Sequence, residues 1–278
     1  MSSRFLIRDS SLLDSFAEVF VMRRLLALCL ICLLGVSALA ADVTVTYLGH
    51  SCFTIQEEGG PIVMLDPYGT YVPYPALPKP ADIVLMTHAH IDHCPPCYGE
   101  DRVDGDPIEV FLLDDNGRCR EKIPPSAWVI TDDFKTSAIE ASHVNARGGG
   151  QGYVCMFSFE VGGIRFAHLG DLGTLLSAKQ MQALSDVDVL FLPVGEQFTL
   201  DAAEAMTVIA QVPSAKIVMP MHYKVAGITP WPDMAPLSEF AALAEVMGTV
   251  VDKNTSSVVL SADALPATTE IWILDYER

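Results

Sequence analysis

The segment THAHIDHC, residues 87–94, places three histidines and one aspartate within six consecutive positions. It directly follows ADIVLM, an almost uncharged apolar run that predicts a buried strand. Positions i and i+2 do not face one another on a helix, whereas alternate side chains can converge in a turn. We therefore expect His88 and His90 to share one cation, and Asp92 and His93 to turn towards a second one.

Three further metal-binding side chains stand where predicted strands end. His143 follows AIEAS, Asp171 follows IRFAHLG and His222 follows KIVMPM. Imidazole and carboxylate together suit a borderline divalent cation, zinc or manganese by preference. Seven ligands exceed one tetrahedral site and match two sites that share a carboxylate. The alternative, a set of surface or packed histidines, is weak for four ligands so closely spaced after a buried strand.

Two cations held in this way would bridge a hydroxide and lower the pKa of water towards neutrality. The pattern therefore predicts a metal-dependent hydrolase that cleaves an ester, lactone, amide or phosphoester bond in a small molecule. Asp92 would be the catalytic residue, because it would orient the hydroxide as well as bind metal. The alternative is an exported metal-binding or sensing protein that keeps the site without turnover.

The elements that must position these residues are short strands interspersed with helices, which indicates an α+β fold of layered sheets covered by helices. The proline-rich segment 71–80 predicts a surface loop, and 94–126 is loop-rich. Helices are expected at 177–185, 201–211 and 236–247. Strands are expected at 43–47, 52–56, 61–66, 82–86, 138–144, 187–194, 215–221, 256–261 and 270–275, with a hairpin over 153–171.

Other polar residues have a structural interpretation beside a functional one. Asp201 and Glu204 have the spacing of a helix N-cap, which we favour over a catalytic pair. For His50, a role in supporting the site or in contacting substrate is weighed equally with that of a packed structural histidine. His168 is expected to support structure rather than bind metal, and Asp66 to organise a loop or a ligand.

The N-terminal segment has the three parts of a secretory signal. Residues 22–40 begin with two arginines, continue with an apolar core and end in Ala-Leu-Ala before Ala41. The apolar run is short for a spanning helix, which needs about 20 residues. Residues 1–21 would be an upstream extension. We expect a single hydrolase domain at 41–278, periplasmic or secreted and without a stable membrane anchor.

The charge of the chain limits its partners. The formal charge is −18, and residues 1–40 hold four arginines and three acidic residues, so the mature chain would carry −19. This acidity disfavours a nucleic-acid partner, because phosphate backbones require a basic face. It also disfavours adsorption to anionic lipids. We expect a small-molecule substrate. The sequence is compatible with a homo-oligomer. Tyr223 and Lys224 follow His222 and could touch substrate, although an exposed lysine is the simpler interpretation.

The mature chain would hold five cysteines, an odd number, so at least one thiol stays free or pairs elsewhere. Cys94-Pro-Pro-Cys97 could be a redox pair, a metal clip or a disulfide element. Export favours a disulfide that involves Cys94, Cys97 or Cys119. Its connectivity with Cys52 and Cys155 is not contained in the sequence.

Several motifs occur in the order typical of one superfamily. THAHIDH, SH at 142–143, HLGDLG at 168–173 and MPMHY at 219–223 resemble the successive motifs of the metallo-β-lactamase superfamily of hydrolases. LGHSCFTI, VDVLFLPVG and TLDAAEA resemble, more narrowly, the metal-dependent hydrolases akin to L-ascorbate-6-phosphate lactonase. The resemblance covers nearly all of 43–224. It implies a four-layer αββα sandwich with two metal ions at one edge.

The resemblance also divides the ligands between the two ions. It implies His88, His90 and His143 for the first, Asp92, His93 and His222 for the second, and Asp171 as the bridge. Iron redox members tend to carry Glu at the second histidine of the motif, so His90 favours hydrolysis. The chain departs from the pattern at CPPCYG, where relatives often have Gly.

Overall fold

The computed structural model describes residues 41–112, 131, 134–144, 150–247 and 249–278. Residues 1–40, where the signal and upstream extension are predicted, lie outside this described part, as does Cys119. Within it, no helix combines the length and apolar character needed to cross a membrane.

The first of two main sheets has six strands and contains the N-terminal part of the described chain. Alternation in VTVTY turns Val43, Val45 and Tyr47 inward, where each is at most 1% exposed. β1, β2 and β3 are antiparallel neighbours, whereas β3, β5 and β7 run parallel. The strand order is β14 (Ser257–Leu260), β1 (Val43–Gly49), β2 (Cys52–Glu57), β3 (Ile62–Leu65), β5 (Ile83–Met86) and β7 (Ile108–Phe111).

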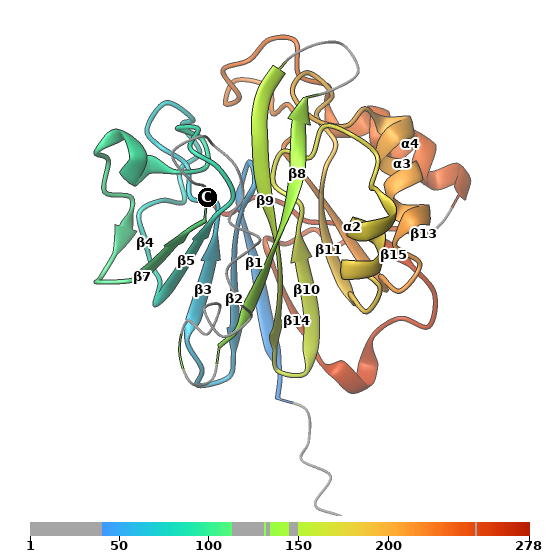
Figure 1. The fold of residues 1–278 in the computed structure, drawn as a ribbon, viewed down its shortest axis with the longest axis horizontal. Helices are drawn as coiled ribbons and strands as arrows, with labels where there is room; N and C mark the ends of the chain where they lie inside the picture. Colours follow the sequence, from blue (N-terminus) through green and yellow to red (C-terminus); the bar gives the residue numbers. More distant parts are fainter. Residues whose placement is uncertain (1–40, 113–130, 132–133, 145–149, 248) are drawn as a thin grey trace, which may run out of the picture. The chain divides into compact units, whose positions relative to one another are not determined.

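The second sheet has seven strands, antiparallel from β8 to β10 and parallel from β10 onward. Its order is β13 (Thr249–Asp252), β15 (Glu270–Ile273), β12 (Ile217–Met221), β11 (Val189–Pro193), β10 (Ile164–His168), β9 (Gly150–Val161) and β8 (Thr136–Val144). Helices α2 (Ala178–Ala183), α3 (Ala202–Gln211) and α4 (Leu237–Met247) lie beside this sheet, away from the first one (Figure 1). Asp201 and Glu204 form the capping box of α3, which confirms that prediction.

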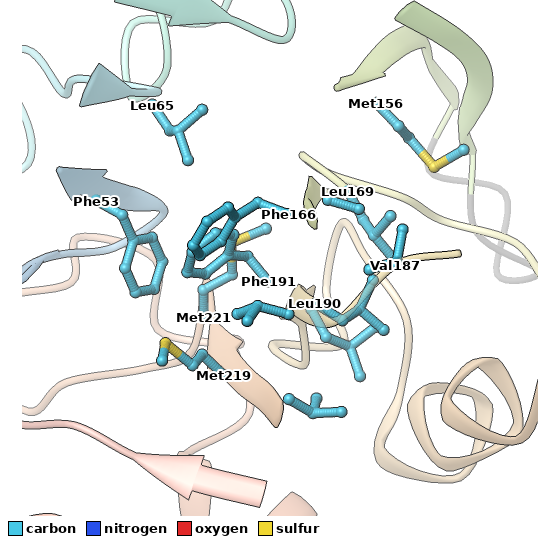
Figure 2. Packing of buried hydrophobic residues seen from close by; sticks show 14 of the residues in the cluster. Phe53, Leu65, Met156, Phe166, Leu169, Val187, Leu190, Phe191, Met219 and Met221 are labelled. Atoms are coloured by element: carbon cyan, nitrogen blue, oxygen red, sulfur yellow. The ribbon is translucent and has the colours of Figure 1, made fainter. Parts of the chain in front are cut away.

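Aromatic and aliphatic side chains fill the space between the two sheets. Phe53 of the first sheet contacts Phe191 of the second, with ring centroids 4.3 Å apart, and Phe166 stacks on Phe191 (Figure 2). Such aromatic pairs add about 0.5–1.5 kcal/mol beyond their burial. The expected sandwich is confirmed, and this core fixes the two sheets face to face.

The outer face of the first sheet is covered differently from the second. Segment 71–80 is a loop as predicted, except for its last two residues, and it is not confined to the surface: Val72, Tyr74 and Leu77 are at most 5% exposed. They pack with Met64 and Met86 in a second hydrophobic cluster. Among the described residues this layer consists of loops and the 3-10 helix η1 (Pro95–Tyr98), joined by the short strands β4 (Lys79–Pro80) and β6 (Val103–Asp104).

Candidate metal centre

The predicted ligands lie at one edge of the sandwich, where strands of both sheets end. Two backbone hydrogen bonds join the sheets at this edge. Cys155 N donates to Thr87 O over 2.9 Å, and His222 N donates to His50 O over 2.8 Å. Ligands from distant parts of the sequence therefore meet on a backbone that is fixed from both sides.

The first cluster contains His88, His90, His143 and Asp171, whose ligand atoms lie within 4.8 Å of one another. His90 Nδ1 is 3.0 Å from His88 Nε2 and 3.3 Å from His143 Nε2. Asp171 Oδ2 lies 3.7 Å from His88 Nε2 and 3.4 Å from His143 Nε2. The three histidines expected to share one ion are thus brought together.

The second cluster contains Asp92, His93 and His222, the residues expected at the other ion, together with His50. Asp171 reaches this cluster as well. Its Oδ1 is 3.2 Å from His93 Nε2, and its Oδ2 is 3.3 Å from His222 Nε2. Asp171 therefore lies between the clusters, and all seven predicted residues converge. His50 Nε2 donates to Asp92 Oδ2 over 2.9 Å.

Asp66, at the end of β3, orients one histidine of each cluster. Its Oδ1 accepts from Thr87 N over 2.8 Å, and its Oδ2 accepts from Thr87 Oγ1 over 2.7 Å. Because that hydroxyl donates to Asp66, it accepts from His88 Nδ1, 3.0 Å away. His93 Nδ1 donates to the same Asp66 Oδ2 over 2.8 Å. Both imidazoles therefore carry a proton on Nδ1 and direct Nε2 towards Asp171.

Two further histidines are oriented by backbone carbonyls. His143 Nδ1 donates to Phe198 O over 3.2 Å, which leaves its Nε2 facing the first cluster. His168 Nε2 donates to Ser51 O over 2.9 Å, and its Nδ1 accepts from Gly170 N over 3.2 Å. His168 thus supports the turn that carries Asp171 and belongs to none of the clusters.

Burial sets the charge of most imidazoles in the centre. It lowers the pKa of His50 and of His143 to about 4, and the pKa of His88 well below its usual range. These rings are neutral near pH 7, the form that binds metal. Burial acts in the same direction on the pKa of His93, but the surrounding carboxylates, Asp171 foremost, raise that pKa well above its usual value.

The carboxylates of Asp92 and Asp171 are ionised. Burial alone would raise the pKa of Asp92 and of Asp171. For Asp92 the neighbouring His93 outweighs burial, and for Asp171 His222 and His93 do, so that both pKa values fall well below the usual range. Anionic oxygens surrounded by mostly neutral imidazoles form a site that favours a cation.

Several buried polar atoms in the centre have no hydrogen-bond partner among the described residues. They include His222 Nδ1, and also His93 Nε2 and Asp171 Oδ1, which face each other over 3.2 Å as an ion pair without hydrogen-bond geometry. Buried polar atoms without hydrogen bonds cost free energy, so their gathering at one place is consistent with a site that takes a ligand. Nitrogen and carboxylate donors that already lie within 4.8 Å of one another fit divalent metal ions.

The backbone at the centre adopts conformations that side chains rarely occupy. Among the described residues, five non-glycine residues have positive φ, and three of them lie here: His50 (55°), Asp66 (39°) and His222 (53°). Backbone strain of this kind clusters at functional sites. In addition, a Cβ on Gly195 would lie 1.9 Å from the carbonyl oxygen of His222, so only glycine fits beside that histidine.

A pocket of about 270 Å³ opens above the two clusters. Its floor holds ligand residues of both clusters and its sides are largely aromatic. We call the four aromatic residues the aromatic wall: Tyr71, Tyr98, Phe198 and Trp231. The remaining lining residues are His90, Ile91, Asp92, His143 and Asp171. The sequence did not reveal the wall, because its four members come from four separate segments, three loops and the helix η1, and share no spacing.

Comparison with known proteins agrees with this geometry. The family model described as β-lactamase superfamily domain matches residues 44–222, a span that includes all seven predicted ligands. A candidate Zn-dependent hydrolase of the metallo-β-lactamase superfamily from Thermotoga maritima has a TM-score of 0.59 and 26% identity, and the match covers 84% of this chain and 100% of that one. A metallo hydrolase from Ignicoccus hospitalis, 20% identical with a TM-score of 0.51 over 79% of this chain and 99% of its own, shares the fold.

Relatives known from sequence extend the match. The UPF0173 metal-dependent hydrolase of Carboxydothermus hydrogenoformans is 29% identical over 222 residues, which are 74% of this chain and 94% of the relative. Its counterpart in Thermococcus onnurineus is 30% identical over 218 residues, 69% of this chain and 88% of the relative. The chain therefore belongs to the metallo-β-lactamase superfamily, within the family of the UPF0173 metal-dependent hydrolases.

Proposed function

We propose that this protein binds two divalent metal ions, zinc or manganese, and hydrolyses an ester, lactone, amide or phosphoester bond of a small molecule. The observation that carries the proposal is the position of Asp171, whose two oxygens lie 3.2–3.4 Å from imidazole nitrogens of both clusters. A single carboxylate between two imidazole clusters is the arrangement that two neighbouring ions require.

Each residue has a role in this proposal. Asp171 would bridge the ions. The remaining ligands would be His88, His90 and His143 for one ion and Asp92, His93 and His222 for the other. When bound, the ions supply an acidified water molecule and a polarised substrate oxygen.

Asp92 is the acidic group best placed to take part in the reaction. Its side chain lines the pocket, so substrate and water can reach it. Its pKa lies well below the usual range despite burial, because of His93 and the hydrogen bond that His50 donates. An ionised carboxylate held in this position orients the attacking water and accepts a hydrogen bond from it.

The test is a panel of chromogenic esters, lactones, amides and phosphodiesters, assayed with protein reconstituted with zinc or with manganese. We expect turnover of at least one class. Asp92→Asn should lower kcat by about 100-fold or more. Asp101→Asn is the matched control, because it removes an exposed carboxylate nine positions further along the chain. A protein that binds two ions and hydrolyses no class would refute the proposal in favour of a metal-binding or sensing role.

We further propose that the protein works in an oxidising compartment. Cys94 and Cys97 form a disulfide, and Cys155 is also disulfide-bonded, which supports export because disulfides persist outside the reducing cytoplasm. Cys52 is a buried free thiol. Mass spectrometry of the exported protein should find an N-terminus at or near Ala41. A full-length cytoplasmic product would contradict the proposal.

A further inference from the structure

We infer that the pocket selects substrates whose non-reacting part is planar, apolar and free of anionic groups, and that this part lies against Trp231. The inference rests on the proposed function for what happens at the pocket floor. It adds the class of substrate, which neither the ligand geometry nor the family assignment contains.

The aromatic wall is built around Trp231. Its ring centroid lies 5.8 Å from that of Tyr71 and 6.4 Å from that of Phe198, both in edge-on arrangements. On another side it stacks on His50, 5.5 Å away with an interplanar angle of 24°. The hydroxyl of Tyr98 donates to Ala89 O over 2.9 Å, which fixes that ring beside the ligand loop. The wall is therefore held in place before any substrate enters.

The wall leads directly to the reacting groups. His50, on which Trp231 stacks, donates to Asp92, and Phe198 O accepts from His143. A planar group lying on Trp231 therefore continues towards a bond placed over Asp92 and His143. The pocket of about 270 Å³ is slightly smaller than typical small-molecule sites of about 300–1,000 Å³, so we expect it to admit one ring and a short reactive group.

Charge in the pocket opposes an anionic substrate tail. Among the described residues that line it, there is no lysine or arginine. Lys224, the nearest basic residue after His222 in sequence, is turned to the Trp231 loop, where its Nζ donates to Pro232 O. A phosphate or carboxylate tail would lie among aromatic rings without the charge-assisted partner that such groups require. Desolvating it there would weaken binding.

The experiment compares two benzyl methyl ethers, which cannot be hydrolysed as esters or amides. They are the neutral parent and a derivative with a 4-sulfonate. Dissociation constants are measured by calorimetry or ligand-observed NMR with the metal-loaded full chain. We expect the neutral ether to bind about tenfold more tightly than the sulfonate, because the anionic group must lose water against the wall and finds no basic partner there. Equal or tighter binding of the sulfonate would overturn the inference.

Variants locate the binding surface. Trp231→Ala should weaken binding of the neutral ether about tenfold, and Trp231→Phe by about threefold at most. Trp272→Ala is the matched control, since Trp272 lies on β15 under Lys253 Nζ and does not line the pocket. If Trp231→Ala does not fold, Tyr71→Ala replaces it, because that ring is 54% exposed and still contacts Trp231. If a folded Trp231→Ala or Tyr71→Ala variant binds the neutral ether as tightly as the native protein, the ether binds outside the aromatic wall and the inference is wrong.

Catalysis is tested separately with α-amino-γ-butyrolactone acylated by an acetyl, phenylacetyl or succinyl group. The reacting lactone is the same in all three, so differences in kcat/KM report the substituent, and the phenylacetyl compound should exceed the other two about tenfold. Ether discrimination without hydrolysis of any panel substrate would support this inference and contradict the proposed function. Hydrolysis of a panel substrate without any preference between the two ethers would support the proposed function and contradict this inference.

Discussion

Replacing Asp66 by Asn should weaken both metal sites at once, although Asp66 is not an expected ligand. In the native protein one carboxylate accepts hydrogen bonds from Thr87 N, Thr87 Oγ1 and His93 Nδ1. Asparagine keeps the shape and one acceptor oxygen, which can still accept from Thr87 N. Its NH₂ group, however, would face His93 Nδ1 and the threonine hydroxyl, and both now donate to this position.

The conflict is relieved only if the imidazoles change tautomer. His93 would move its proton from Nδ1 to Nε2, and His88 would do the same once the Thr87 hydroxyl donates to it. Nε2 is the atom that each ring directs towards Asp171, 3.2 Å away for His93 and 3.7 Å for His88. Loss of an orienting partner typically lowers metal affinity 10- to 100-fold, which corresponds to about 1.4–2.7 kcal/mol at each ion.

The assay is competition with a chelator of known affinity, with unfolding by urea followed in parallel on metal-free protein. Asp66→Asn should show weaker affinity for both ions and only a modest fall in the stability of the metal-free protein. Asp66→Ala should unfold more readily, by about 1–3 kcal/mol for each buried donor left unpaired. Asp82→Asn is the control, because this exposed aspartate also accepts a backbone hydrogen bond, from Ile62 N over 2.8 Å, away from the centre. Native affinity in Asp66→Asn for both ions, or loss of one ion alone, would refute this account of the network.

Three further outcomes test the centre. Asp171→Ala should lose both ions together in elemental analysis, because its oxygens contact both clusters, and retention of one ion would refute the bridge. His50→Ala and His168→Ala should keep both ions while activity falls about 10- to 100-fold, because the His50 ring holds Asp92 and the His168 ring holds Ser51 O. An empty metal position in either variant would contradict their assignment as supporting residues. In metal-free protein, ¹⁵N NMR should show His93 doubly protonated at pH 7, because its pKa is raised. The charged ring then stabilises the metal-free fold fully below its ordinary pKa near 6.5, and this contribution should vanish as pH rises through the raised pKa. A neutral His93 ring at pH 7 would disprove the upward shift of its pKa.

The convergence of the seven candidate residues could be predicted because its signals are local in the sequence. A buried strand followed by H-x-H-x-D-H leaves few alternatives, and the ends of the strands before His143, Asp171 and His222 were recognisable from their apolar runs. The expected helices also lie within a few residues of α2, α3 and α4, because their caps and apolar spacing are local signals as well.

Features that depend on distant contacts were not predicted. β7 lies in the segment 94–126, expected to be loop-rich, because its pairing with β5 decides its conformation. β13 was missed for the same reason, as it is formed by pairing with β15. The proline-rich loop 71–80 is buried because it covers the outer face of a sheet, which composition alone does not reveal. The hydrogen bonds of Asp66 likewise join residues 21 and 27 positions away.

The strand order has a consequence for how the chain folds during synthesis. β1 begins the described chain, yet its partner β14 is made 211 residues later, as the contact of Thr46 with Ser257 shows. β15, which lies between β12 and β13, is made later still. At roughly 5–20 residues per second, β14 is synthesised about 10–40 seconds after β1. Neither sheet can close before residues 257–273 are available, so a chain truncated before them would expose a strand edge that can pair with other chains.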